Sequence, residues 1–143
     1  MRFPKQISRL SFVSTVILSL LALSAYSASS AGKSRVFFTS PTDKATVGSP
    51  VKVTMGAEGF TIEPAGEVKA GAGHLHIMVD TDCVAAGQAV PKDDTHLHFG
   101  KGQTEAELKL SPGSHTLCLQ AGDGAHVAVA GEGMTQKITI TVK

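Results

Sequence analysis

Tryptophan is absent from this 143-residue chain, and Phe, Tyr and Trp together make up only 5% of it. The single tyrosine, Tyr26, lies before residue 32, so that phenylalanines supply the few remaining rings of this kind. Proteins that stack bases or sugars on aromatic platforms need several such rings. The shortage therefore argues against a protein that recognises single-stranded nucleic acid or carbohydrate by stacking.

Acidic residues are absent from the first 31 positions, which contain Arg2, Lys5 and Arg9. Subtracting these three from the thirteen basic residues leaves ten, against twelve acidic residues, so residues 32–143 carry a formal net charge of −2. Proteins that bind nucleic acid or anionic membranes usually carry a basic patch. We therefore expect no nucleic-acid partner, and the partner is expected to be a metal ion or a protein of the cell envelope.

The chain has no apolar run of the roughly 20 residues that a membrane-spanning helix needs. The shorter apolar stretch 11–23 follows the basic residues and precedes a run of small residues, an order that is typical of a secretory signal peptide. We expect residues 1–31 to be a signal peptide, cleaved after Ser27 or after Ala31. Residues 32–143 would then form a single periplasmic or secreted domain with no stable membrane insertion.

Cysteine is scarce, with only Cys83 and Cys118. In an exported protein, the first expectation for two such residues is a disulfide. A bridge that closes a loop of about 35 residues would stabilise the fold by roughly 3–4 kcal/mol. A pair of thiol ligands for a metal ion is the alternative that the sequence leaves open.

Beyond residue 31 the apolar residues alternate with a period of two and show no helical period. In 51–57, for example, Val51, Val53 and Met55 alternate with polar residues, which indicates a half-buried strand. Turns rich in Gly, Pro and Asp separate such segments. The expected strands are 35–38, 51–57, 74–80, 96–99, 104–110, 115–120 and 137–142, with 126–130 as a further candidate. This pattern predicts an all-β, immunoglobulin-like β-sandwich of about seven short strands, with a small barrel as the alternative.

All six histidines lie between residues 74 and 126, and four of them form two copies of one tripeptide, His74-Leu75-His76 and His96-Leu97-His98. Side chains two residues apart on a strand point to the same face, about 6–7 Å from each other. If the two segments are neighbours in space, four imidazoles converge. Imidazole suits copper, zinc and nickel, with Cu(II) favoured by a planar set of nitrogens and Zn(II) by a tetrahedral one.

The first hypothesis is therefore a metal-binding module that uses copper or, failing that, zinc. The expected ligands are His74, His76, His96 and His98, and the additional candidates are Met78 as a soft ligand, Asp80 as an orienting carboxylate and His126 as a fifth ligand. The alternative hypothesis is a non-catalytic module of the cell envelope in which the histidines and aspartates form a rigid hydrogen-bond network.

Signs of catalysis are few. The glycines in 99–105 precede neither a helical pattern nor a Lys-Ser/Thr pair, so they do not indicate a phosphate loop. No serine has the surroundings of a nucleophile elbow. A small metalloenzyme with an open coordination position is the third hypothesis. His115 shares a strand face with Leu117 and Leu119, and we interpret it as a structural residue.

Three stretches and one aspartate carry a resemblance to a known family: GHLH at 73–76, Asp80, HLHFGKGQTEA at 96–106 and PGSHTL at 112–117. Over residues 36–142 the chain resembles the bacterial exported domain-of-unknown-function family 4399. That family has no established activity, so the resemblance implies an exported domain and no particular reaction. The chain departs from the family at Leu75, where members often carry a histidine, and at 127–131, where they tend to carry proline or tyrosine.

Overall fold

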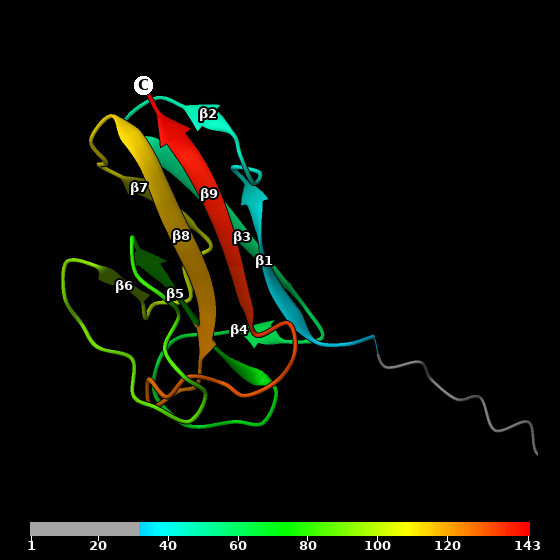
Figure 1. The fold of residues 1–143 in the computed structure, drawn as a ribbon. Helices are drawn as coiled ribbons and strands as arrows, with labels where there is room; N and C mark the ends of the chain where they lie inside the picture. Colours follow the sequence, from blue (N-terminus) through cyan, green and yellow to red (C-terminus); the bar gives the residue numbers. More distant parts are fainter. Residues whose placement is uncertain (1–31) are drawn as a thin grey trace, which may run out of the picture.

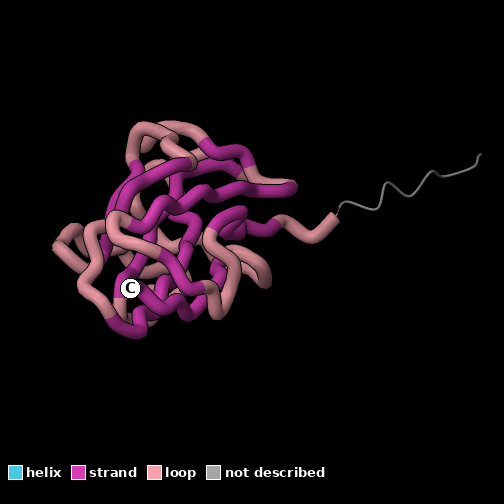
Figure 2. The backbone as a smooth tube through the Cα atoms, turned by 90° about the horizontal axis from the view of Figure 1, so that it is seen from above, coloured by secondary structure: helices cyan, strands magenta, loops and turns pink. Residues whose placement is uncertain are grey.

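The computed structural model describes residues 32–143, and in this range the backbone consists of strands and loops without a helix (Figures 1 and 2). The expected signal peptide, residues 1–31, lies outside the described residues. Nine strands in the described range build two sheets. The predicted all-β class and sandwich architecture are thereby confirmed. No helix suited to crossing a membrane occurs between residues 32 and 143.

The smaller sheet contains three antiparallel strands in the order β1–β3–β7. These strands are β1 (Arg35–Ser40), β3 (Val51–Glu58) and β7 (Glu105–Leu108). In β3 the side chains of Val51, Val53 and Met55 are buried, whereas Lys52 between them is exposed. The alternation of apolar and polar residues therefore places one face of this sheet against the core.

The larger sheet contains six strands in the order β2–β9–β8–β5–β4, and β6 also pairs with β5. Its strands are β2 (Thr46–Val47), β4 (Thr61–Ile62), β5 (Ala72–Val79), β6 (His96–Phe99), β8 (Gly113–Gly122) and β9 (Thr135–Val142). The two-residue strands β2 and β4 run parallel to their neighbours, and the other pairs are antiparallel. Strand β5 has neighbours along both edges, so it lies in the interior of the sheet.

The strands in the described range differ from the expectation in two respects: two additional strands raise their number to nine, and one candidate segment is not a strand. Strands β2 and β4 are only two residues long, too short for alternation to reveal them. The segment 126–130, a further candidate for a strand, makes only isolated bridges through Val127 and Ala128. His126 has a φ of +66°, which turns the backbone away from the extended conformation at the start of this segment.

The main core lies between the two sheets and draws buried side chains from both of them. Its members include Val36, Phe38, Val51, Val53, Met55, Leu75, Ile77, Leu117, Leu119, Ile138 and Ile140. Burying each apolar side chain of this size contributes about 1.5–3 kcal/mol to folding. The packing of the two sheets therefore supplies most of the driving force for the fold.

Strand β5 is buried on both faces, which distinguishes it from β3. Leu75 and Ile77 point into the main core, as the alternation predicts. On the opposite face, Met78 joins a second apolar cluster with Val90, Cys118 and other residues. In Figure 1 the loop between β5 and β6 and the loop between β8 and β9 gather at the lower end of the sandwich. These loops supply residues that cover the outer face of β5.

Two attachments fix the loop after β5 to strand β8. The predicted disulfide is confirmed: it joins Cys83 to Cys118, whose Cα atoms are 5.6 Å apart. The buried side chain of Gln120 accepts a hydrogen bond from the Val84 amide (2.9 Å) and donates one to the Val84 carbonyl (2.7 Å). Because both cysteines are used in the bridge, neither thiol serves as a metal ligand in this structure.

We predict that the double substitution Cys83→Ala/Cys118→Ala lowers the free energy of unfolding by about 3 kcal/mol, because it frees the unfolded chain from a cross-link. Urea unfolding followed by circular dichroism measures this difference. Reduction of the wild-type protein with dithiothreitol is the control and should produce a similar loss. An unchanged unfolding midpoint would show that the bridge adds no stability.

Candidate metal centre

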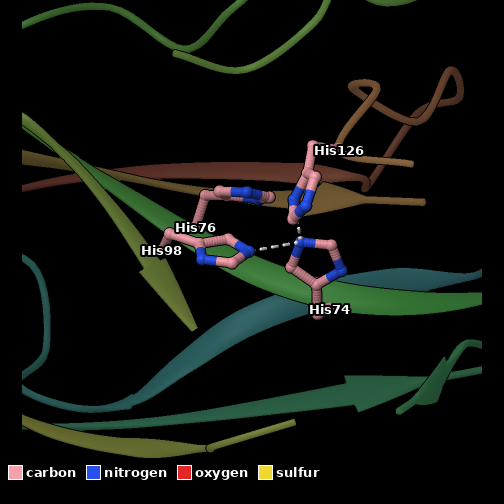
Figure 3. Close-up of side chains that lie close together, drawn as sticks. All are labelled: His74, His76, His98 and His126. Carbon is pink, nitrogen blue, oxygen red and sulfur yellow. Dashed lines mark hydrogen bonds between the residues drawn. The ribbon is translucent and has the colours of Figure 1, made fainter. Parts of the chain in front are cut away.

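Four histidine side chains from three segments of the chain meet on the outer face of β5 (Figure 3). His74 and His76 belong to β5, His98 belongs to β6, and His126 follows β8. One ring nitrogen from each lies within 4.8 Å of the others, and no second group of this kind occurs among residues 32–143. We call these four residues the histidine cluster.

The register of the strands explains how the cluster forms. His76 lies directly opposite His98 in the antiparallel β5–β6 pair, so both side chains leave the same face. His74, two residues earlier, shares that face. Along the other edge of β5, strand β8 places Gly122 opposite His74. The turn that follows Gly122 then brings His126 to His74.

A tight turn holds His126 in an uncommon backbone conformation. The Asp123 carboxylate accepts hydrogen bonds from the amides of Ala125 (2.8 Å) and Val127 (3.0 Å), and the His126 amide donates to the Asp123 carbonyl (3.1 Å). The Val90 amide donates to the His126 carbonyl (2.8 Å). The φ of +66° at His126 costs about 1–3 kcal/mol in a non-glycine residue. These hydrogen bonds maintain the strained conformation that positions the ring.

Two spacings between nitrogens of the cluster match those between ligands of one ion. His74 Nε2 lies 3.0 Å from His126 Nδ1 and 3.1 Å from His98 Nε2. Four nitrogens bound to one ion at about 2.0 Å lie about 2.8–3.3 Å from their neighbours, in planar and tetrahedral geometry respectively. Both distances fall within this range, and the other nitrogens of the cluster lie up to 4.8 Å apart. The same spacing serves a hydrogen bond between neutral rings when no ion is bound.

Two members of the cluster are fully buried and incompletely bonded. His74 and His76 are both 0% exposed, whereas His98 and His126 are half-buried. Neither nitrogen of His76 has a hydrogen-bond partner, and Nδ1 of His74 also has none. A buried polar atom without a partner costs about 1–3 kcal/mol. The His76 imidazole is therefore buried without a hydrogen bond that would offset the cost of removing it from water.

Burial keeps His74, His76 and His98 uncharged at neutral pH. It lowers the pKa of His76 to about 3 and that of His74 to about 4, with additional lowering from the other histidines of the cluster. Burial likewise lowers the pKa of His98. At pH 7 these rings are neutral and offer the lone pairs that a metal ion requires.

Two glycines make room for the rings. A Cβ atom at Gly122 would lie 2.5 Å from Cε1 of His76, and one at Gly100 would overlap the His98 ring. Any larger residue at either position would displace the neighbouring imidazole. Gly100 follows the second tripeptide after one intervening residue, and it accommodates the His98 ring as well as forming a turn.

The structure brings together three of the four expected ligands and adds His126 in place of His96. His96 lies opposite Met78 in the β5–β6 pair, and its Nδ1 is 2.8 Å from the Asp93 carboxylate. Met78 is packed in the second apolar cluster with Cys118. The register therefore places His96 two residues away from His98 along β6, opposite Met78 and outside the cluster. His126 carried only a weak signal in the sequence, because its approach depends on the β5–β8 register.

Asp80 orients His115, which lies outside the histidine cluster. Its carboxylate lies 2.7 Å from His115 Nδ1 and accepts the Thr116 amide hydrogen (2.9 Å), while His115 Nε2 lies 2.8 Å from the Ser111 carbonyl. The hydrogen bond to Asp80 raises the pKa of His115. Burial alone would raise the pKa of Asp80, but its hydrogen bonds to His115 and Thr116 outweigh that effect and lower it. The pair joins β8 to the end of β5.

The fold and the cluster define a class of protein: an all-β sandwich with a group of four imidazoles on one of its sheets. The chain belongs to the domain-of-unknown-function family DUF4399, whose model matches residues 53–143. The resemblance inferred from the motifs is thereby confirmed, and the matched range includes all four cluster histidines. Neither the curated proteins nor the solved structures include a match.

We predict that Asp80→Asn lowers the free energy of unfolding by about 1 kcal/mol, a modest amount because the pair is partly exposed. The raised pKa of His115 stabilises the fold below its ordinary value of 6.5 and the benefit fades at higher pH. The lowered pKa of Asp80 stabilises the fold above its ordinary value of 3.8 and the benefit fades in acid. The difference should therefore be largest between these values.

Urea unfolding at acidic, intermediate and alkaline pH measures this dependence, with Asp94→Asn as the control at an exposed aspartate. A destabilisation of Asp80→Asn that is the same at every pH would contradict the assignment of the ion pair.

Proposed function

We propose that this protein binds a transition-metal ion through His74, His76, His98 and His126, with copper preferred over zinc. The observation that carries the proposal is the His76 ring, which is 0% exposed, lies among three other imidazoles and lacks a partner on both nitrogens. Fully buried polar groups are normally bonded. An ion bound by the cluster would supply a bond to His76 and use the convergence of all four rings.

The chemistry of the donors favours copper. All four donors are imidazoles, and both cysteines are bound to each other. Calcium and magnesium prefer oxygen ligands, so this set does not suit them. Imidazole suits copper, zinc and nickel, and Cu(II) binds most tightly to a given set of such donors. A nitrogen-only site without a thiolate or carboxylate therefore supports copper first and zinc second.

We place this function in the periplasm or outside the cell, as metal handling rather than catalysis. The disulfide between Cys83 and Cys118 supports an oxidising compartment. His98 and His126 are half-buried, so one side of the cluster is within reach of solvent. An ion could enter and leave on that side without unfolding of β5, which suits uptake and release.

The alternative, a rigid histidine network, draws support from the two contacts that His74 makes with His98 and His126. His76 takes part in no such hydrogen bond. The two functions therefore differ in what they require of His76. In a network it stabilises the protein, whereas as a metal ligand it destabilises the metal-free form.

We predict that the wild-type protein, without a polyhistidine tag, binds one Cu(II) ion with sub-micromolar affinity in a calorimetric titration. His126→Ala should weaken this affinity by at least about 100-fold, because one of four ligands is removed. His96→Ala is the matched control and should leave the affinity within about threefold, because His96 lies outside the cluster. A larger loss in His96→Ala than in His126→Ala would contradict the proposed ligand set, and absence of binding would refute the function.

We predict further that His76→Leu makes the metal-free protein more stable by about 1–2 kcal/mol, because leucine leaves no polar atom without a partner. The same variant should lose the stabilisation that added Cu(II) gives to the wild type. His115→Leu, which removes a bonded histidine, is the control and should be destabilising. Thermal unfolding of the three proteins, with and without Cu(II), measures these differences in stability. Destabilisation of metal-free His76→Leu to the extent of His115→Leu would favour the network.

A further inference from the structure

The six histidines of the chain differ in their partners. Two of them lie outside the histidine cluster, and each has a carboxylate beside its Nδ1 atom: Asp93 lies 2.8 Å from that of His96, and Asp80 lies 2.7 Å from that of His115. Among residues 32–143, no carboxylate pairs in this way with a ring of the cluster. Carboxylates therefore orient the two histidines that stay outside the cluster and none of the four that converge.

Asp123 lies in the turn that carries His126, but its carboxylate bonds to the backbone. It accepts the amide hydrogens of Ala125 (2.8 Å) and Val127 (3.0 Å). Burial is the main cause of the low pKa of His74, and the charge of Asp123 opposes this lowering. The charge of Asp123 thus reaches the cluster, whereas no ring nitrogen of the cluster donates a hydrogen bond to it.

The two fully buried rings have no partners on their outer nitrogens. His74 approaches His98 and His126 through its Nε2 atom, and its Nδ1 atom has no hydrogen-bond partner. His76 has no partner on either nitrogen. A ligand imidazole that donates its outer N–H to a carboxylate becomes a more basic donor, which favours an ion of higher charge. The buried rings of the cluster are imidazole donors without that reinforcement.

The surroundings of the buried rings also disfavour a high charge. The side chains of His74 and His76 are 0% exposed. Met78 lies two residues beyond His76 on the same face of β5 and is buried in the second apolar cluster. The cost of moving an ion from water into such surroundings rises with the square of its charge, so it is greater for a divalent ion than for a monovalent one. The apolar shell of a metal site influences its redox potential for this reason.

We propose that the histidine cluster is selective for monovalent copper and binds Cu(I) more tightly than Cu(II). This inference rests on the proposed metal-binding function and names the form of the ion that the site takes up and releases. By linkage, tighter binding of Cu(I) makes bound copper harder to oxidise than free copper. The ion enters and leaves in the same oxidation state, so no electron is transferred.

The first test compares the two ions on the wild-type protein without a polyhistidine tag. The dissociation constant for Cu(I) is measured in the absence of oxygen by competition with the coloured chelator bicinchoninate. The constant for Cu(II) is measured by competition with nitrilotriacetate. The Cu(I) constant should be smaller by about tenfold or more, which is the size of effect that the outer partners of metal ligands have on affinity.

The second test changes the charge of one ligand. His126 approaches His74 through its Nδ1 atom (3.0 Å), and the δ oxygen of Asp or Asn occupies nearly the same position on the side chain. Both residues tolerate the φ of +66° found here. The ratio of the Cu(II) constant to the Cu(I) constant should be about tenfold or more lower in His126→Asp than in His126→Asn, because a carboxylate attracts a divalent ion more strongly. Ser114→Asp, which adds a charge at an exposed position near the other end of β8, should retain the wild-type ratio.

Wild-type protein that binds Cu(II) as tightly as Cu(I), or more tightly, would overturn this inference and leave the proposed metal site in place. Equal ratios in His126→Asp and His126→Asn would overturn it as well, because the preference would then not depend on the charge of the ligands. Should these variants fail to fold, as seen by circular dichroism, or fail to bind copper, the wild-type comparison decides. Absence of binding of both ions to the wild type would refute this inference and the proposed function together.

Discussion

An imidazole in a protein interior is unfavourable when its nitrogens lack partners, and strand β5 imposes this condition on His76 and in part on His74. The rest of the structure around β5 follows from that constraint. One face of the strand is committed to the main core through Leu75 and Ile77, so the histidines must occupy the other face. The residues that cover that face exclude water from the rings of His74 and His76 and keep these rings neutral. Their nitrogens can then bond only to neighbouring rings or to an ion.

The cover depends on connections that lie outside the cluster. The disulfide from Cys83 and the hydrogen bonds between Gln120 and Val84 attach the first loop to β8. The amide of Val90 then connects this loop, which lies between β5 and β6, to His126 in the loop between β8 and β9. Four imidazoles from distant parts of the sequence are thus placed by strand register and loop attachment together. Because the fold already sets these positions, binding of the proposed ion would cost little further conformational freedom.

Much of this fold follows from the sequence, because alternation in segments such as 51–57 reports directly on burial. The disulfide followed from the presence of two cysteines in a chain expected to be exported. The exchange of His96 for His126 could not be predicted, since both tripeptides look equivalent until the β5–β6 register is known. His126 approaches through a positive-φ turn, and local sequence patterns do not reveal which strand that turn will face.

The proposed binding of one ion by four imidazoles on the outer face of β5 can be observed at the metal itself. X-ray absorption spectroscopy of the protein loaded with one equivalent of copper reports the type, number and distance of the ligand atoms. We expect about four nitrogen neighbours near 2.0 Å with the multiple-scattering pattern of imidazole rings. A shell dominated by oxygen, or one with a single imidazole, would contradict this proposal and indicate that the histidine cluster has only a structural role.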